Sequence, residues 1–204
     1  MNYAMSAVPK IPAYLTLDEF LVWDAPGPER WQLVDGVPTA MAPASRSHGA
    51  IQIELGRLIG NHLAEKGLPC SVIAAPGLVP HINAKTNFRI PDLAVSCKAY
   101  EKEEYAVSGV VLAIEILSPS NKAETWLNVW AYASIPSVKE IAVFHSVRLG
   151  VELLRRGIDG GEGAFWPETP ALIEKGDVTF ESVGFSFPVA VAYRTTRLAA
   201  EAPK

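Results

Sequence analysis

The stretch FRIPDLAVSC, residues 88–97, decides how the chain folds, together with GVVLAIEILSPSN, residues 109–121, which follows about one strand later. Each stretch reads as an apolar strand that carries one acid: Asp92 follows Pro91 in the first, and Glu115 is the single acid of an apolar run in the second. Because both flanks of Glu115 are apolar, we expect its strand to be central in a sheet and covered on both faces. A carboxylate buried there without a partner is costly, so the acids need an explanation.

Two explanations of the acids are open. Glu115 can form a buried ion pair with Arg89 or Lys122, although such pairs are a weak source of stability. Alternatively, Asp92 and Glu115 lie side by side on neighbouring strands and converge on Mg²⁺, which takes one or two carboxylates together with waters and phosphate oxygens. Pro91 fits either case, because it has no N–H for a ladder and marks a bulge or a strand edge that redirects Asp92.

The chain before the first acid predicts two helices and a hairpin. Thr16 is a capping residue for a short helix, with an acid three positions later as its capping-box partner. A hairpin is expected to turn at Asp35-Gly36, a favoured two-residue turn. Ser45 or Ser47 then begins an amphipathic helix that ends at Gly67 and packs its apolar stripe on a sheet.

The rest of the chain completes a single α+β domain. We expect strands at about 70–81, 88–97, 109–118, 139–146 and 150–156, a helix from Asn121 to about Ser134, and a glycine-rich loop at 157–163. Asn121 is expected to cap that helix with Glu124 at the capping-box position, and His62 is expected on the surface or facing a partner. No repeat or linker is visible, so the domain is assigned to residues 15–204, after an N-terminal arm at residues 1–14.

Composition limits the classes of protein to consider. The net charge of −4 gives no overall attraction to nucleic acid or anionic membranes, although a basic groove can exist on an acidic protein. No apolar run reaches the roughly 18–20 residues that span a bilayer, and the N-terminus lacks the pattern of a signal peptide. Cys70 and Cys97 lack metal-ligand spacing, so we expect two reduced core cysteines in a cytoplasmic protein.

The ordered set of motifs resembles the Uma-type family of restriction-endonuclease domains, within the PD-(D/E)XK nuclease superfamily. The motifs are TLDEFLVWDAP, RWQLVDG, SRSHGAIQIELGRLIGNHL, RIPDLAVSC, IEILSPSN and the helix leading into IPSVKEIAVF. The resemblance implies a restriction-endonuclease-like mixed β-sheet flanked by helices. It also implies Mg²⁺- or Mn²⁺-dependent hydrolysis of nucleic-acid phosphodiesters, with DNA favoured over RNA, by a homodimer.

The resemblance also assigns candidate site residues. Asp92 and Glu115 match the metal ligands of the family, and the residue after Glu115, Ile116, would offer its backbone carbonyl. His48 matches a histidine that the family often has at the start of the long helix. The candidate substrate contacts are His48, Ser118 and Arg89, with Ser118 at a helix N-terminus where backbone N–H groups can bind phosphate.

Two positions depart from the family pattern. Gln32 stands where the family usually has a glutamate. The family's lysine follows an acid on the next helix by one turn, and after Glu124 that position is Asn128 in this chain. Lys122 is a possible substitute. Because a positioned acid–base group typically contributes 10²–10⁴-fold to the rate, a weakened nuclease and a catalytically silent nucleic-acid-binding, regulatory or assembly module both stay open.

Overall fold

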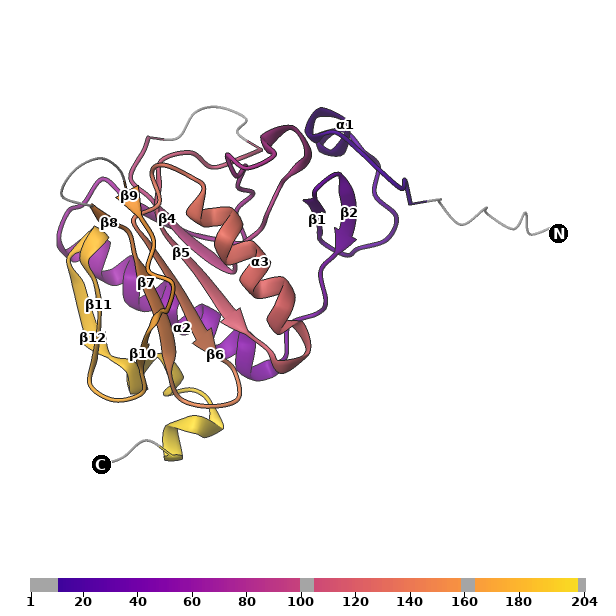
Figure 1. Ribbon diagram of the computed structural model, residues 1–204. Coiled ribbons are helices and arrows are strands. Elements are labelled where there is room, and N and C mark those ends of the chain that lie inside the picture. The colour runs from indigo at the N-terminus through magenta and orange to yellow at the C-terminus, as the bar shows by residue number, and fades with distance from the viewer. Residues whose placement is uncertain (1–10, 100–104, 159–163, 202–204) are drawn as a thin grey trace, which may run out of the picture.

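The computed structural model describes residues 11–99, 105–158 and 164–201, and its centre is a six-stranded mixed sheet (Figure 1). In spatial order the strands are β10 (Ala171–Ile173), β7 (Val151–Arg155), β6 (Glu140–His145), β5 (Val110–Leu117), β4 (Leu93–Ser96) and β3 (Ser71–Ala74). Strands β5 and β6 are parallel, whereas every other neighbouring pair in this sheet is antiparallel. The expected α+β class with a mixed sheet is confirmed.

Two helices cover the opposite faces of this sheet: α2 (Arg46–Glu65) and α3 (Lys122–Ala133). Ile114 and Ile116 of β5 belong to the core beneath α2, and the alternating residues of the same strand belong to the core beneath α3. The alternation of side chains therefore places Glu115 on the α3 face. Strand β5 is central and covered on both sides, as its continuous apolar run predicts.

Shorter elements complete the chain on either side of this core. They are α1 (Leu17–Leu21), β1 (Trp31–Val34), β2 (Val37–Ala40), η1 (Ala84–Thr86), η2 (Pro119–Asn121), β8 (Gly157–Ile158), β9 (Ala164–Phe165), β11 (Asp177–Phe180), η3 (Glu181–Val183), β12 (Phe185–Pro188), η4 (Val189–Tyr193) and η5 (Arg197–Glu201). The C-terminal elements add apolar side chains to the core beneath α2. The β1–β2 hairpin lies beyond α3, beside α1 (Figure 1). Most of the expected N-terminal arm, residues 1–10, falls outside the described residues.

Local sequence signals at the N-terminal elements are confirmed. The Thr16 hydroxyl accepts a hydrogen bond from the Glu19 N–H, and the Glu19 carboxylate accepts one from the Thr16 N–H at 2.8 Å, which completes the capping box. The hairpin turns at Asp35 and Gly36, whose φ values are +48° and +85°. Two successive residues with positive φ match the right-handed twist of the flanking strands, and Asp-Gly accepts this conformation readily.

The two long helices are capped in different ways at their N-termini. Ser45, rather than Ser47, caps α2. Asn121 occupies the N-cap position of α3 as expected, but its side chain does not cap that helix: Asn121 Oδ1 accepts a hydrogen bond from the Ser118 N–H at 3.1 Å, and the two residues form a capping box around η2. Proline at position 119 favours this extra 3₁₀ turn. Asn121 therefore interacts with Ser118 in the turn before α3, and not with Glu124 in the first turn of α3.

Pro91 marks a break in the predicted strand 88–97. Arg89 pairs with Leu78 through an isolated antiparallel bridge, and β4 begins only at Leu93. Between them the chain changes partners, so Asp92 stands directly before β4 at the edge of its ladder. The described register shift in β4 lies further along, so Pro91 acts as a strand boundary rather than a bulge.

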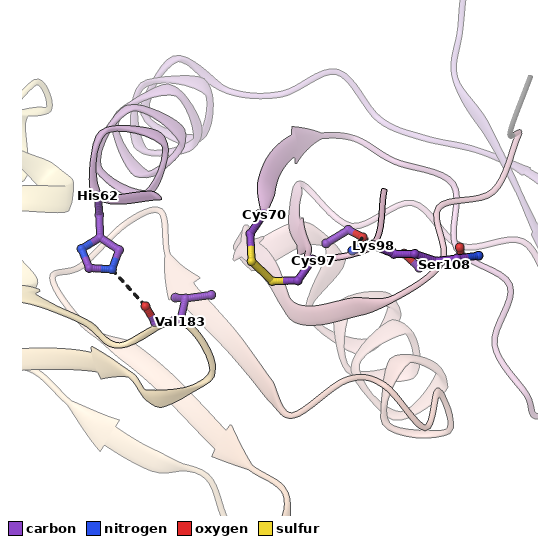
Figure 2. The surroundings of a disulfide bond; sticks show 7 residues. His62, Cys70, Cys97, Lys98, Ser108 and Val183 are labelled. Carbon is purple, nitrogen blue, oxygen red and sulfur yellow. Dashed lines mark hydrogen bonds between the residues drawn. A yellow bond between two sulfur atoms is a disulfide. The ribbon is translucent and has the colours of Figure 1, made fainter. Parts of the chain in front are cut away.

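Cys70 and Cys97 form a disulfide bond, so the expectation of two reduced core cysteines is wrong (Figure 2). Antiparallel β3 and β4 pair Ser71 with Ser96, and extending that register by one residue sets the two cysteines opposite each other, with their Cα atoms 3.9 Å apart. The pairing depends on strand register, which the spacing of two cysteines does not reveal. The cysteines therefore do not indicate a reducing compartment.

His62 is buried rather than exposed, contrary to expectation. Its Nε2 donates a hydrogen bond to the Val183 carbonyl at 2.9 Å (Figure 2), and its ring stacks on Phe185 with ring centroids 4.5 Å apart. The C-terminal segment packs over α2 through these contacts. Within the described residues, no helix combines the length and the apolar character needed to cross a membrane.

Candidate active site

The two acids meet at one edge of the central sheet. Asp92 precedes β4, and Glu115 lies in β5, the antiparallel neighbour of β4. The Ile116 N–H donates to Asp92 Oδ2 at 2.7 Å, which ties the first acid to the strand of the second. Extending the β4–β5 register one residue beyond Leu93 and Ile114 sets Asp92 opposite Glu115. The structure thus brings together the two acids that the sequence singles out.

Helix α2 fixes the position of Asp92 from the other side. His48, in its first turn, contacts Asp92 Oδ1 through Nε2 at 2.8 Å. One turn later, Gln52 donates from Nε2 to the Asp92 carbonyl at 2.8 Å, and the Ala75 N–H donates to the same carbonyl at 3.0 Å. His48 was predicted as a phosphate contact, and the structure places it against the acid that would hold the cation.

Helix α3 holds Glu115 with neutral donors. The Tyr132 hydroxyl donates to Glu115 Oε1 at 2.8 Å, and Asn128 Nδ2 approaches the same oxygen at 3.4 Å. Burial raises the pKa of Glu115 well above its usual range, and the neighbouring charge of Asp92 raises it further. Without a cation, both effects favour the protonated form of Glu115.

The buried ion-pair explanation of Glu115 does not hold for the described residues, where neither Arg89 nor Lys122 forms an ion pair with it. The buried Arg89 guanidinium donates from Nη1 to Asn128 Oδ1 at 2.9 Å and from Nε and Nη2 to Asn87 Oδ1 at 3.0 and 2.8 Å. The Asn128 amide therefore stands between Arg89 and Glu115. With its donors occupied in this way, Arg89 does not fit the predicted role of a substrate contact.

A pocket of about 520 Å³ opens above the acids. Its walls are the β1–β2 hairpin with the loop that follows, the first turns of α2, the segment before β4, and the start of α3. Of the residues predicted from the sequence, Gln32, His48, Asp92, Glu115 and Asn128 line the pocket, whereas Ile116, Ser118, Lys122 and Arg89 do not. Ile116 nevertheless lies beside Asp92 through its backbone.

The side chains of Ser118 and Lys122 interact with residues outside the pocket. Ser118 completes the capping box of η2. Lys122 is exposed, and its charge acts on the β6 residue His145: burial lowers the pKa of His145, and the nearby charges of Arg148 and Lys122 lower it further. Neither side chain lines the pocket.

Gln32 carries a polar atom that lacks a protein partner. Its side chain is fully buried, and Nε2 donates to Glu124 Oε1 at 2.7 Å, but Oε1 accepts no hydrogen bond. Buried polar atoms are nearly always satisfied, so this oxygen calls for a ligand. Hard divalent cations take carboxylate and amide oxygens together. The described residues contain no cluster of three His, Cys, Asp or Glu side chains suited to a metal, so a cation held by Asp92 and Glu115 would complete its coordination with neutral oxygens, such as this one or those of water.

Arg30 and Tyr132 also belong to the site, although the sequence analysis did not assign them to it. Arg30 lines the pocket and stands two residues before Gln32, so strand alternation already places the two side chains on one face. Tyr132 stands one helical turn after Asn128, which sets both beside Glu115. The spacing of Glu124, Asn128 and Tyr132 predicts that these three residues share one helix face, and the strand alternation was the signal that could have identified Arg30.

Residues 17–189 match the family Uma2, described as "putative restriction endonuclease", and this span contains every residue that lines the pocket. The chain belongs to the Uma2 family. The resemblance drawn from the motifs is confirmed. This Uma2 chain is 27% identical over 182 residues to an uncharacterized protein, slr1290, of Synechocystis sp., covering 88% of this chain and 92% of the relative.

A solved structure shares the fold of this Uma2 protein. It is a putative nuclease belonging to DUF820 from Anabaena variabilis, with a TM-score of 0.66 and 14% sequence identity over 88% of this chain and 97% of the other. At that identity the likeness establishes the fold alone, and it confirms the nuclease-like mixed sheet flanked by helices. The roles of individual site residues rest on the geometry described above.

Proposed function

We propose that this Uma2 protein hydrolyses phosphodiester bonds in DNA with the help of Mg²⁺ or Mn²⁺. The observation that carries the proposal is the placement of Asp92 opposite Glu115 on neighbouring strands, with both side chains lining one pocket. Two neighbouring carboxylates repel each other, and a divalent cation removes that cost. The description of the Uma2 family and that of the Anabaena variabilis structure support the same reaction class.

The ligands of the cation would be Asp92, Glu115 and Oε1 of Gln32, with the Ile116 carbonyl as a further candidate. When bound, the cation would polarise the phosphate and lower the pKa of a bound water. The protein orients these ligands: His48 and the Ile116 N–H hold the two oxygens of Asp92, and Glu124 holds the Gln32 amide.

The supporting charge is weaker than in lysine-containing relatives. Asn128 reaches Glu115 with a neutral amide, and its other end is occupied by Arg89. A lysine near the attacking water stabilises the negative charge of the transition state, which an amide does less well. We therefore propose slow turnover. The same observation favours a second candidate, a catalytically silent module that binds nucleic acid through this pocket.

Metal titration and plasmid nicking together test these proposals. Calorimetry with Mg²⁺ and Mn²⁺ compares the wild type with Asp92→Asn and with Asp177→Asn, a control at an exposed acid of β11. Nicking of supercoiled DNA is then measured for the same three proteins. Metal binding and nicking that only Asp92→Asn removes support the nuclease. Metal and DNA binding without nicking support the silent module, and absence of metal binding refutes the cation site.

The assembly and the location of the protein are further proposals. We propose a homodimer, because α3 exposes Leu127 and Trp130, with 60% and 45% of their surface accessible. Sedimentation across the micromolar range checks it, and a monomer throughout would contradict it. The cytoplasm is the proposed location, since cellular DNA is the proposed substrate.

A further inference from the structure

The charges that line the pocket are strongly uneven. Four carboxylate side chains line it: Glu29, Asp92, Glu115 and Glu124. Among the described lining residues, Arg30 is the one lysine or arginine. A pocket with this balance binds cations at its floor, but a phosphodiester that approaches it meets repulsion from the acids. An anionic substrate therefore requires a compensating positive charge near the mouth.

The β1–β2 hairpin determines where Arg30 lies. The Arg30 carbonyl accepts a hydrogen bond from the Met41 N–H at 2.8 Å, which extends the ladder by one pair beyond Trp31 and Ala40. Side chains two residues apart on a strand share a face and stand about 7 Å apart along it. Arg30 thus points to the same side as Gln32. Gln32 is fully buried at the floor and Arg30 is exposed, so the guanidinium stands toward the mouth.

The Arg30 guanidinium is free to bind a ligand. Among the described residues, no ion pair involves it, and the neighbouring Glu29 carboxylate lies against Gly27. The other cations near the site differ: Arg89 is buried on two asparagine side chains, and Lys122 lies on the side of His145. A guanidinium presents a planar set of donors that matches two phosphate oxygens at once.

We propose that Arg30 binds a phosphate of the DNA strand at the mouth of the pocket and holds the scissile phosphodiester over Asp92 and Glu115. This inference rests on the proposed function and names the residue that recognises the substrate. The positive charge at this pocket is thereby supplied from the β1–β2 hairpin. Hydrogen bonds from Arg30 to the non-bridging oxygens would also counter the charge that develops on them during cleavage.

Equilibrium DNA binding tests this role independently of cleavage. Fluorescence anisotropy of a labelled duplex is measured at several salt concentrations, without metal, for the wild type, Arg30→Ala and Arg30→Lys. Lys66→Ala is the matched control, because this exposed lysine follows the far end of the 20-residue helix α2, about 30 Å from its first turn. Calorimetric metal affinity and the thermal midpoint of each variant show whether the pocket and the fold are intact.

The expected result is specific to a phosphate contact. Arg30→Ala weakens DNA binding about tenfold and lowers the slope of log affinity against log salt by about one, and Arg30→Lys recovers part of the affinity but not all of it. Lys66→Ala leaves both quantities near wild type. Unchanged affinity and slope in Arg30→Ala would overturn the inference while leaving the proposed nuclease intact. A wild type that binds no DNA at any salt concentration would refute the proposed function, and this role of Arg30 with it.

Discussion

Replacing Glu115 with glutamine should stabilise the metal-free protein at neutral pH. Burial and the charge of Asp92 raise the pKa of Glu115 above its usual value, so the folded state keeps a proton that the unfolded state releases. The contribution of this group to the free energy of unfolding is complete below the ordinary pKa of glutamate. It is lost as the pH rises toward the raised pKa. One extra proton on the folded state gives a slope of at most about −1.4 kcal/mol per pH unit.

The variant Glu115→Gln keeps the shape of the side chain without the titration. Its amide oxygen still accepts from the Tyr132 hydroxyl, and the amide places no second negative charge beside Asp92. The free energy of unfolding should therefore vary with pH in the same way for wild type and variant below the ordinary pKa of glutamate. Above it, the variant gains relative stability with each pH unit until Glu115 ionises in the folded wild type.

Urea unfolding measures this difference. Tryptophan fluorescence follows the transition in EDTA from pH 5 to pH 9 for the wild type, Glu115→Gln and a control, Glu29→Gln, which neutralises an exposed acid of the same pocket. The control should stay within about 0.5 kcal/mol of wild type. Parallel pH profiles for wild type and Glu115→Gln would refute the reasoning, because they would show that ionised Glu115 carries no penalty in the fold.

Three other perturbations have defined outcomes. Replacing Cys70 and Cys97 with serine should lower the free energy of unfolding by up to about 3.5 kcal/mol, the loop-closure estimate for a sequence separation of 27, and an unchanged urea midpoint would contradict this. Asn128→Lys should increase plasmid nicking, because it sets an ammonium beside Glu115, and should leave metal affinity little changed at a pH where Glu115 is already ionised in the free protein; equal nicking by variant and wild type would count against it. Glu140→Ala should lower the free energy of unfolding by about 2–3 kcal/mol, because the buried Glu140 carboxylate accepts hydrogen bonds from an arginine and two backbone N–H groups. Thermal unfolding measures this loss, and a value below about 0.5 kcal/mol would show these bonds to be dispensable.

The elements that the sequence predicted well are those that a continuous pattern specifies. Strand β5 was expected at 109–118 and runs from Val110 to Leu117, because an apolar run covered on both faces has clear ends. The neighbouring strands were predicted too long: β3 ends at Ala74 and β4 begins at Leu93. Their lengths depend on where partner strands leave the sheet, and that information is not local.

The same distinction applies to the candidate site. Alternation and strand adjacency were enough to bring Asp92 and Glu115 together. The partners of Arg89 and the free oxygen of Gln32 depend on how the hairpin and α3 dock against the sheet, which no single segment encodes. For the same reason, the sequence suggested Lys122 as the positively charged side chain of the pocket, whereas the structure shows that Arg30 of the docked hairpin lines it.

The Asn128 amide links the charge of the site to its chemistry. Arg89 is a donor only, so Asn128 Oδ1 must face it, and this orientation turns Nδ2 toward Glu115. An uncharged donor does not overcome the burial of Glu115, and the pKa of that carboxyl stays raised. A divalent cation at this floor therefore has to displace a proton as it binds, so its affinity should increase with pH until Glu115 is ionised in the free protein. In a relative with a lysine here, the ammonium would already hold the carboxylate ionised, and metal binding would depend less on pH. An asparagine in place of a lysine would thus change the pH at which this site acquires its charge.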